Sequence, residues 1–74
     1  MKYEFGNVIR ELREERGIKQ KWVAEKVGIT VNRMGRLERG ESEPTVDELA
    51  RIANIYGITL QGIVDKAMRK VVAA

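Results

Sequence analysis

Residues 20–39 read QKWVAEKVGITVNRMGRLER, and the fold follows from this stretch. Apolar residues recur at helical spacing on both sides of Gly28, which predicts two short helices at about 20–27 and 31–39. Gly28 tolerates the positive φ that a tight turn needs, and Thr30 is a suitable N-cap for the second helix. Because two short helices joined by such a turn cross steeply, the stretch predicts a rigid crossed pair.

This crossed pair has a buried face and an exposed face. The residues expected inside are small or apolar, and they are Val23, Ala24, Val27, Ile29, Met34 and Leu37. The residues left outward on the second helix are Val31, Asn32, Arg33, Gly35 and Arg36. A polar, basic strip on a buried scaffold has the shape and chemistry needed to enter the major groove of double-stranded DNA.

Positive charge is concentrated in the same part of the chain. The 74 residues carry 14 Lys and Arg against 11 Asp and Glu, a formal net charge of +3. Residues 19–39 hold six basic and two acidic side chains, so all of the excess lies in this window. A local basic patch attracts polyanions, of which nucleic acid is the commonest. Most charge runs are solvated faces with no partner, so charge alone does not establish nucleic-acid binding.

The composition excludes several chemistries. Without Cys or His, the chain cannot form disulfides, thiolate or imidazole zinc sites, or a nucleophile paired with His. The carboxylates are scattered and form no pocket motif, so we expect no enzyme activity, no cofactor and no metal. No apolar run approaches the ~18 residues of a membrane span, and the start of the chain lacks a signal core. We therefore expect a cytoplasmic protein with no membrane association.

Helical spacing continues through the rest of the sequence. Three further helices are predicted at about 5–16, 46–56 and 60–72. Thr45, followed three residues later by Glu48, has the capping-box pattern. The residues expected on the inner face of the fourth helix are Val46, Leu49, Ile52, Ala53 and Tyr56. The predicted fold class is all-α, with five helices in a single domain over residues 1–74.

Taken together, these features resemble the phage-repressor-like helix-turn-helix family, the Cro and lambda-repressor type that is also called Xre-like. The resemblance covers about residues 5–64. The segments that carry it are Ile9-Arg10-Glu11-Leu12-Arg13, Gln20 through Gly28, Leu37-Glu38-Arg39-Gly40, Pro44-Thr45 and Leu49 through Leu60. It implies a compact five-helix lambda-repressor-like DNA-binding domain in which the third helix reads the bases.

The resemblance also implies roles for individual residues. The positions that match base-contacting sites are Val31, Asn32, Arg33 and Arg36, of which Arg33 matches a site that contacts base or phosphate. Asn32 could bond bidentately to adenine, and Arg36 to guanine O6 and N7. The positions that match phosphate contacts are Lys19, Gln20, Lys21 and Arg39. Arg13 and Glu38 match a structural ion pair between the first and third helices.

The sequence departs from the family pattern at several positions. Lys19 stands where the family prefers Ser, Thr or Asn, and Lys cannot cap a helix. Glu41 and Glu43 occupy a loop where many relatives place basic phosphate contacts. Gly35 costs ~1 kcal/mol in mid-helix relative to Ala, and we interpret it as a tolerated small residue rather than a close approach to DNA. Trp22 could lie along a phosphate backbone, join a protein contact, or cover the first helix.

The apolar stripe of the last helix continues through Ala67, Met68, Val71 and Val72, beyond what a core of this size needs. Because an exposed apolar strip usually marks an interface, we expect a homodimer contact there. Its predicted residues are Ile63, Ala67, Met68 and Val71. The sequence thus predicts a DNA-binding transcriptional regulator, a repressor that binds a palindromic operator as a homodimer. Two alternatives stay open: a restriction–modification or prophage controller that also activates, and a protein-interaction adaptor that retains the fold.

Overall fold

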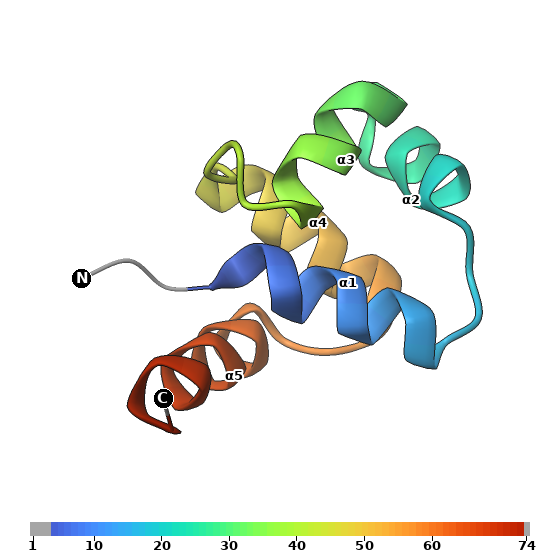
Figure 1. Cartoon of the computed structure of the whole chain (residues 1–74). Coiled ribbons are helices and arrows are strands. Elements are labelled where there is room, and N and C mark those ends of the chain that lie inside the picture. The colour runs from blue at the N-terminus through green and yellow to red at the C-terminus, as the bar shows by residue number, and fades with distance from the viewer. Residues whose placement is uncertain (1–3, 74) are drawn as a thin grey trace.

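The computed structural model describes residues 4–73, with side chains described through residue 70. Its helices are α1 (Phe5–Glu15), α2 (Gln20–Val27), α3 (Val31–Glu38), α4 (Val46–Tyr56) and α5 (Leu60–Ala73) (Figure 1). No strand occurs in this described part of the chain. The observed bounds lie within one residue of the predicted ones, and the predicted all-α fold is confirmed.

The helix ends are set by capping interactions that the sequence predicts. Thr30 Oγ1 accepts the Arg33 backbone N–H at 3.0 Å, which caps α3. Thr45 and Glu48 form a complete capping box at the start of α4, with distances of 2.9 and 3.0 Å. Gly28 ends α2 with a φ of 88°, a conformation that side chains strongly disfavour. These caps fix where each short connection leaves one helix and begins the next.

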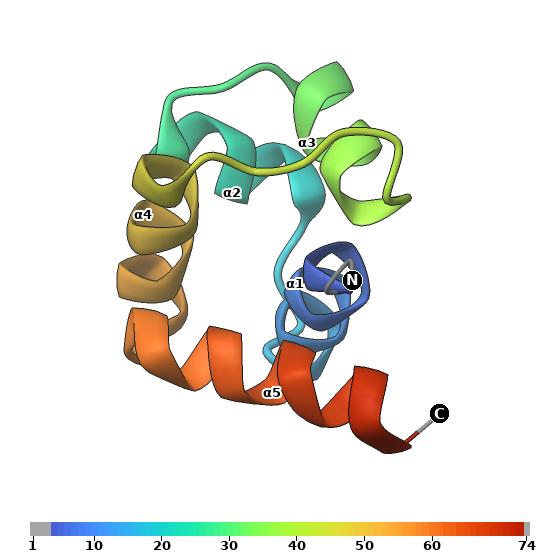
Figure 2. The ribbon, with the colours of Figure 1, turned by 90° about the vertical axis from the view of Figure 1, so that its left-hand side faces the viewer.

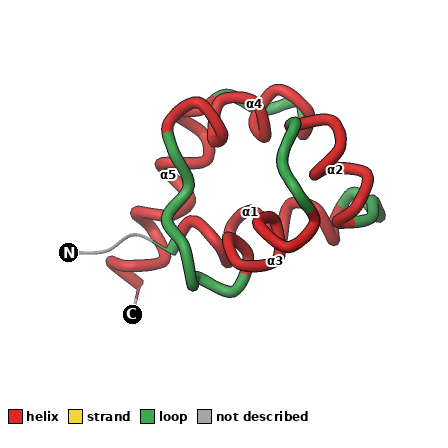
Figure 3. Tube along the Cα trace, turned by 90° about the horizontal axis from the view of Figure 1, so that it is seen from above, coloured by secondary structure: helices red, strands yellow, loops and turns green. Residues whose placement is uncertain are grey.

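The helices surround a single apolar core. Figures 1 and 2 show α2 and α3 together at one end of the molecule and α5 at the opposite end, and Figure 3 shows the helices from above, arranged around the core. The buried apolar residues are Val8, Ile9, Leu12, Val23, Ala24, Val27, Met34, Leu37, Leu49, Ile52, Ala53, Tyr56, Ile63 and Ala67. Every helix contributes to this set, so the orientation of α3 depends on the packing of the whole domain.

Two predictions about burial are wrong. Val46 is predicted inside but is 72% exposed, because it is the first residue of α4 and lies beyond the edge of the core. Ile63 and Ala67 are predicted at a dimer contact, but both are completely buried in the chain's own core. Within residues 4–73, no helix combines the length and the apolar character that crossing a membrane would require.

Candidate nucleic-acid interface

The face of α3 that points away from the core carries two exposed polar side chains. The helix packs on α1 and α2 through Met34 and Leu37, which are completely buried. Asn32 and Arg36 are exposed and lie one turn apart on the opposite face. Neither side chain forms a hydrogen bond with another described residue. Both polar groups are therefore available to a partner outside the chain.

The first turn and the middle of α3 differ in exposure. Val31, at the first turn, is 43% exposed and places an apolar group beside the polar pair. Gly35 is predicted outward but is buried, because the Arg39 guanidinium lies over it. A Cβ at Gly35 would lie 2.9 Å from Arg39 Nη1, so a methyl group there would meet the end of a flexible side chain. The outward strip is thus narrower than the sequence predicts.

Arg33 is also predicted in the outward strip, but it reaches sideways to α4 instead. Its Nε and Nη2 donate to the two carboxylate oxygens of Glu48, each at 2.8 Å. This bidentate bond is the main reason why the pKa of Glu48 falls from 4.5 to about 2, against the opposing effect of burial, and the Thr45 N–H lowers it further. The structure therefore removes Arg33 from the outward strip and pairs it within the domain.

The start of α2 presents unpaired backbone donors and basic side chains. Lys19 is the N-cap and makes no side-chain capping bond, as the sequence predicts. The N–H groups of Gln20, Lys21 and Trp22 precede the first intrahelical bond, so they have no helical acceptor. One N–H of the Gln20 amide donates to Glu38 at 3.0 Å. Free N–H groups beside two lysines form an environment that favours an anion.

The Arg13–Glu38 pair joins α1 to the end of α3. Arg13 Nε donates to Glu38 Oε2 at 2.7 Å, and Nη2 donates to Oε1 at 3.1 Å. Arg13 Nη1 also donates to the Ile18 carbonyl at 2.9 Å. Glu38 is only 4% exposed, and its hydrogen bond raises the pKa of Arg13. Since Gln20 shares the same carboxylate, this network connects α1, the start of α2 and the end of α3.

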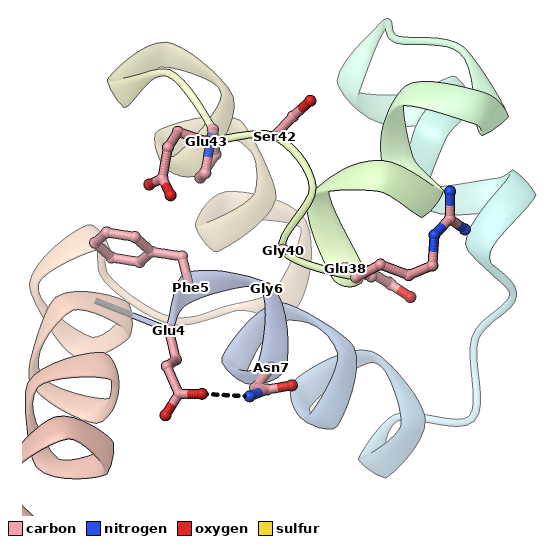
Figure 4. Close-up of a pocket in the computed structure, with 10 residues that line it drawn as sticks. Glu4, Phe5, Gly6, Asn7, Glu38, Gly40, Ser42 and Glu43 are labelled. Atoms are coloured by element: carbon pink, nitrogen blue, oxygen red, sulfur yellow. Dashed lines mark hydrogen bonds between the residues drawn. The ribbon is translucent and has the colours of Figure 1, made fainter. Parts of the chain in front are cut away.

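Gly6 supports the same end of α3, and sequence reasoning misses it. Figure 4 shows Gly6 in α1 beside Glu38 and Gly40. A Cβ at Gly6 would clash with the Leu37 carbonyl oxygen and lie 3.0 Å from the Glu38 carbonyl oxygen. Only glycine lets the two backbones approach this closely. The sequence does carry one signal for this contact. Glycine lowers helix propensity, so a glycine in the first turn of a strongly amphipathic helix suggests that another part of the backbone lies close to it.

A pocket of about 230 Å³ lies beside this contact, between the start of α1 and the segment after α3 (Figure 4). Glu4, Glu38 and Glu43 border it together with Arg39, and the carboxylate of Glu38 is paired with Arg13. This charge balance disfavours an anionic ligand. Among the residues that the structure describes, no group of three or more acidic side chains is arranged to hold a metal ion.

Arg39, a predicted phosphate contact, forms an exposed ion pair. Its Nε donates to Glu41 Oε2 at 2.7 Å, and the two side chains are 58% and 54% exposed. The pair raises the pKa of Arg39 and lowers that of Glu41. Since exposed pairs contribute little, a phosphate group could compete with Glu41 for this guanidinium.

Trp22 points to solvent from α2. It is 45% exposed, and Lys26 Nζ lies 5.3 Å from the centre of its ring. The contact with Lys26 holds the ring on its own helix through a cation–π interaction.

These features define a helix-turn-helix domain. A short α2 is followed by a tight turn at Gly28 and by α3, which packs on α1 and α2 and has a polar outer face. The helix-turn-helix family model matches residues 9–63, and the chain belongs to this family. The family consists of DNA-binding transcriptional regulators and not of enzymes.

Curated relatives of this chain are regulators of the same type. The HTH-type transcriptional regulator DdrOP3 of Deinococcus deserti is 39% identical over 57 residues, which are 77% of this chain and 44% of that protein. The cryptic phage CTXphi transcriptional repressor RstR of Vibrio cholerae is 32% identical over 60 residues, which are 81% of this chain and 54% of that protein. The chain thus spans about half the length of these relatives.

Solved structures show the same fold at lower identity. The clp gene regulator ClgR of Corynebacterium glutamicum matches with a TM-score of 0.91 and 21% identity, covering 96% of this chain and 76% of that chain. The DNA-binding domain of the P22 C2 repressor matches with a TM-score of 0.77 and 23% identity, covering 81% of this chain and 79% of that one. These likenesses establish the fold.

Proposed function

We propose that this chain binds DNA with sequence preference and acts as a transcriptional repressor. The observation that carries the proposal is the pair of exposed side chains on α3, Asn32 and Arg36, neither of which forms a hydrogen bond within the described residues. An amide matches the N6 and N7 atoms of adenine, and a guanidinium matches O6 and N7 of guanine. Val31 adds an apolar group that suits the methyl group of thymine.

The phosphate contacts of the proposed complex lie at the start of α2 and the end of α3. Lys19 and Lys21 flank the free N–H groups of α2, and Gln20 retains one amide N–H for an anion. Arg39 joins them once a phosphate replaces Glu41. Because such contacts release counterions, affinity falls steeply as salt increases.

We further propose that two copies bind a palindromic operator, with two α3 helices entering major grooves whose centres lie ~34 Å apart. The candidate contact on α5 is smaller than the sequence predicts, since Ile63 and Ala67 are buried in the protomer. Met68 is 41% exposed and remains available. The predicted Val71 contact lies outside the residues whose side chains the structure describes.

Selection of bound duplexes from a random pool tests this proposal. We expect an enriched sequence with two inverted half-sites one helical turn apart. The Asn32→Ala and Arg36→Ala variants should each lose preference at one base pair of the half-site. A pool that shows no enrichment with the unaltered protein would contradict the proposed function, and a single half-site would contradict the dimer.

The exposed Trp22 and the acidic residues Glu41 and Glu43 favour a second candidate, a protein-interaction adaptor. Fluorescence anisotropy with random duplex DNA at about 50 and 200 mM salt separates the two. A DNA-binding protein binds the duplex at the lower salt and loses much of its affinity at the higher salt. An adaptor binds weakly at both.

A further inference from the structure

Arg33 and Glu48 connect two helices that otherwise barely touch. α3 packs on α1 and α2, whereas α4 packs on α1, α2 and α5. The fork from Arg33 to Glu48 spans the gap between α3 and α4 with two hydrogen bonds of 2.8 Å. Arg33 Nη2 also lies 3.4 Å from the Glu43 carbonyl oxygen, a marginal contact with the intervening loop.

Both ends of this connection are anchored at helix caps. The Arg33 backbone N–H donates to Thr30 Oγ1 in the cap of α3. Glu48 Oε1 accepts the Thr45 N–H in the capping box of α4 while it accepts Arg33 Nη2. The first turn of α3 is therefore joined to the first turn of α4 through one carboxylate.

The Arg33–Glu48 pair lies next to the residues that are proposed to contact the bases. Arg33 follows Asn32 directly and precedes Arg36 by three residues. A rotation of α3 about its axis would move Asn32 and Arg36 together, and tethering Arg33 resists that rotation. A bidentate guanidinium–carboxylate bond constrains direction as well as distance.

We propose that Arg33 is a positioning residue and not a base reader: bound to Glu48, it sets the angle at which Asn32 and Arg36 meet the bases. The inference rests on the proposed function. Arg33 and Glu48 side chains are 28% and 12% exposed, so the pair is better shielded than the Arg39–Glu41 pair. The carboxylate of Glu48 neutralises the charge of Arg33. Arg33 therefore does not release counterions from DNA when the protein binds.

The test compares Arg33→Met, Glu48→Gln and the double variant on the selected operator and on random duplex over a salt series. Glu48→Gln is informative because glutamine can still serve in a capping box. We expect Arg33→Met and Glu48→Gln each to weaken operator binding about tenfold, and the double variant to weaken it no further. Arg33→Met should leave the salt dependence unchanged. Glu48→Gln frees a cation and should steepen the slope by about one.

The matched controls are Arg39→Met and Glu41→Gln, which alter an exposed pair on the same segment without touching Arg33. Arg39→Met should reduce the salt slope by about one and leave sequence preference intact. Arg33→Lys retains a charge and one donor direction, so it should restore part of the operator affinity. If Arg33→Lys restores no operator affinity, the bidentate fork itself is required. Glu48→Gln, which also breaks the fork, must then weaken operator binding as much as Arg33→Met does.

The inference is overturned if Arg33→Met erases preference at one base pair while Glu48→Gln leaves operator affinity unchanged. It is also overturned if Arg33→Met lowers the salt slope by about one. If the unaltered protein shows no sequence preference, the proposed function fails, and amide hydrogen exchange still tests the connection. Arg33→Met should then speed exchange in the first turn of α4, and unchanged exchange would refute the connection itself.

Discussion

Replacing Arg13 with Met would leave the Glu38 carboxylate buried without its main partner. Glu38 is 4% exposed, and Arg13 supplies two of its three side-chain hydrogen bonds, at 2.7 and 3.1 Å. Removing one member of a buried ion pair costs ~3–5 kcal/mol. Gln20 still donates to the carboxylate, so we expect a loss of ~3 kcal/mol. A domain of this length has ~4–11 kcal/mol of stability, so the loss should be a large fraction of the total.

Urea unfolding followed by circular dichroism measures this loss. The double variant Arg13→Met with Glu38→Leu should be more stable than Arg13→Met alone, because no buried charge remains. Arg39→Met, which breaks an exposed pair, should leave stability almost unchanged.

The reasoning is refuted if Arg13→Met costs no more than Arg39→Met. It is also refuted if adding Glu38→Leu makes the protein less stable than Arg13→Met alone. Either result would mean that water reaches the carboxylate and replaces the lost hydrogen bonds.

Three further predictions concern other parts of the structure. Gly6→Ala gains up to ~1 kcal/mol of helix propensity but clashes with the Leu37 carbonyl oxygen, at a cost of ~1–3 kcal/mol. We expect calorimetry to show a lower Tm, and a higher Tm would contradict the close approach. The pKa of Glu48 is about 2 in the folded protein, below its ordinary 4.5, so its stabilisation is complete above pH ~4.5 and is lost as the pH falls toward 2. Glu48→Gln should therefore reduce the acid dependence of stability by ~1 kcal/mol between pH 5 and 2, and an unchanged acid profile would argue against the pair. Arg36→Ala should cost ~1–3 kcal/mol of operator binding and relax preference at one base pair, whereas Lys21→Ala should weaken binding to all sequences alike. Equal effects of these two variants on every sequence would contradict the division between base and phosphate contacts.

Local signals predict the helices well, because each boundary depends on one or two neighbouring residues. Thr30 and Thr45 cap the helices that follow them, and Gly28 ends the helix that precedes it. Hydrophobic periodicity gives the buried side of a helix but not where the core ends along it. The wrong predictions for Val46 and Ala67 both have this cause.

The outward position of Asn32 and Arg36 could be predicted because Met34 and Leu37 define the opposite face of the same helix. The pairing of Arg33 with Glu48 could not, because the two residues are 15 positions apart in the sequence and a loop lies between them.

For the contact at Gly6, the sequence offers only a signal, a glycine in the first turn of α1, and not the contact itself. It depends on how closely the backbones of α1 and α3 approach, and that distance is set by the tertiary packing. Local spacing therefore predicts which residues face outward, while contacts between helices decide which of them are free to bind.

The central claim is that Asn32 and Arg36 on α3 read the edges of DNA bases. An NMR titration of labelled protein with the selected operator duplex tests this most directly. We predict that nuclear Overhauser contacts link the side chains of Asn32 and Arg36 to base protons in the major groove. If the duplex instead perturbs α5 and leaves residues 31–36 unchanged, α3 is not the recognition helix and the account is wrong.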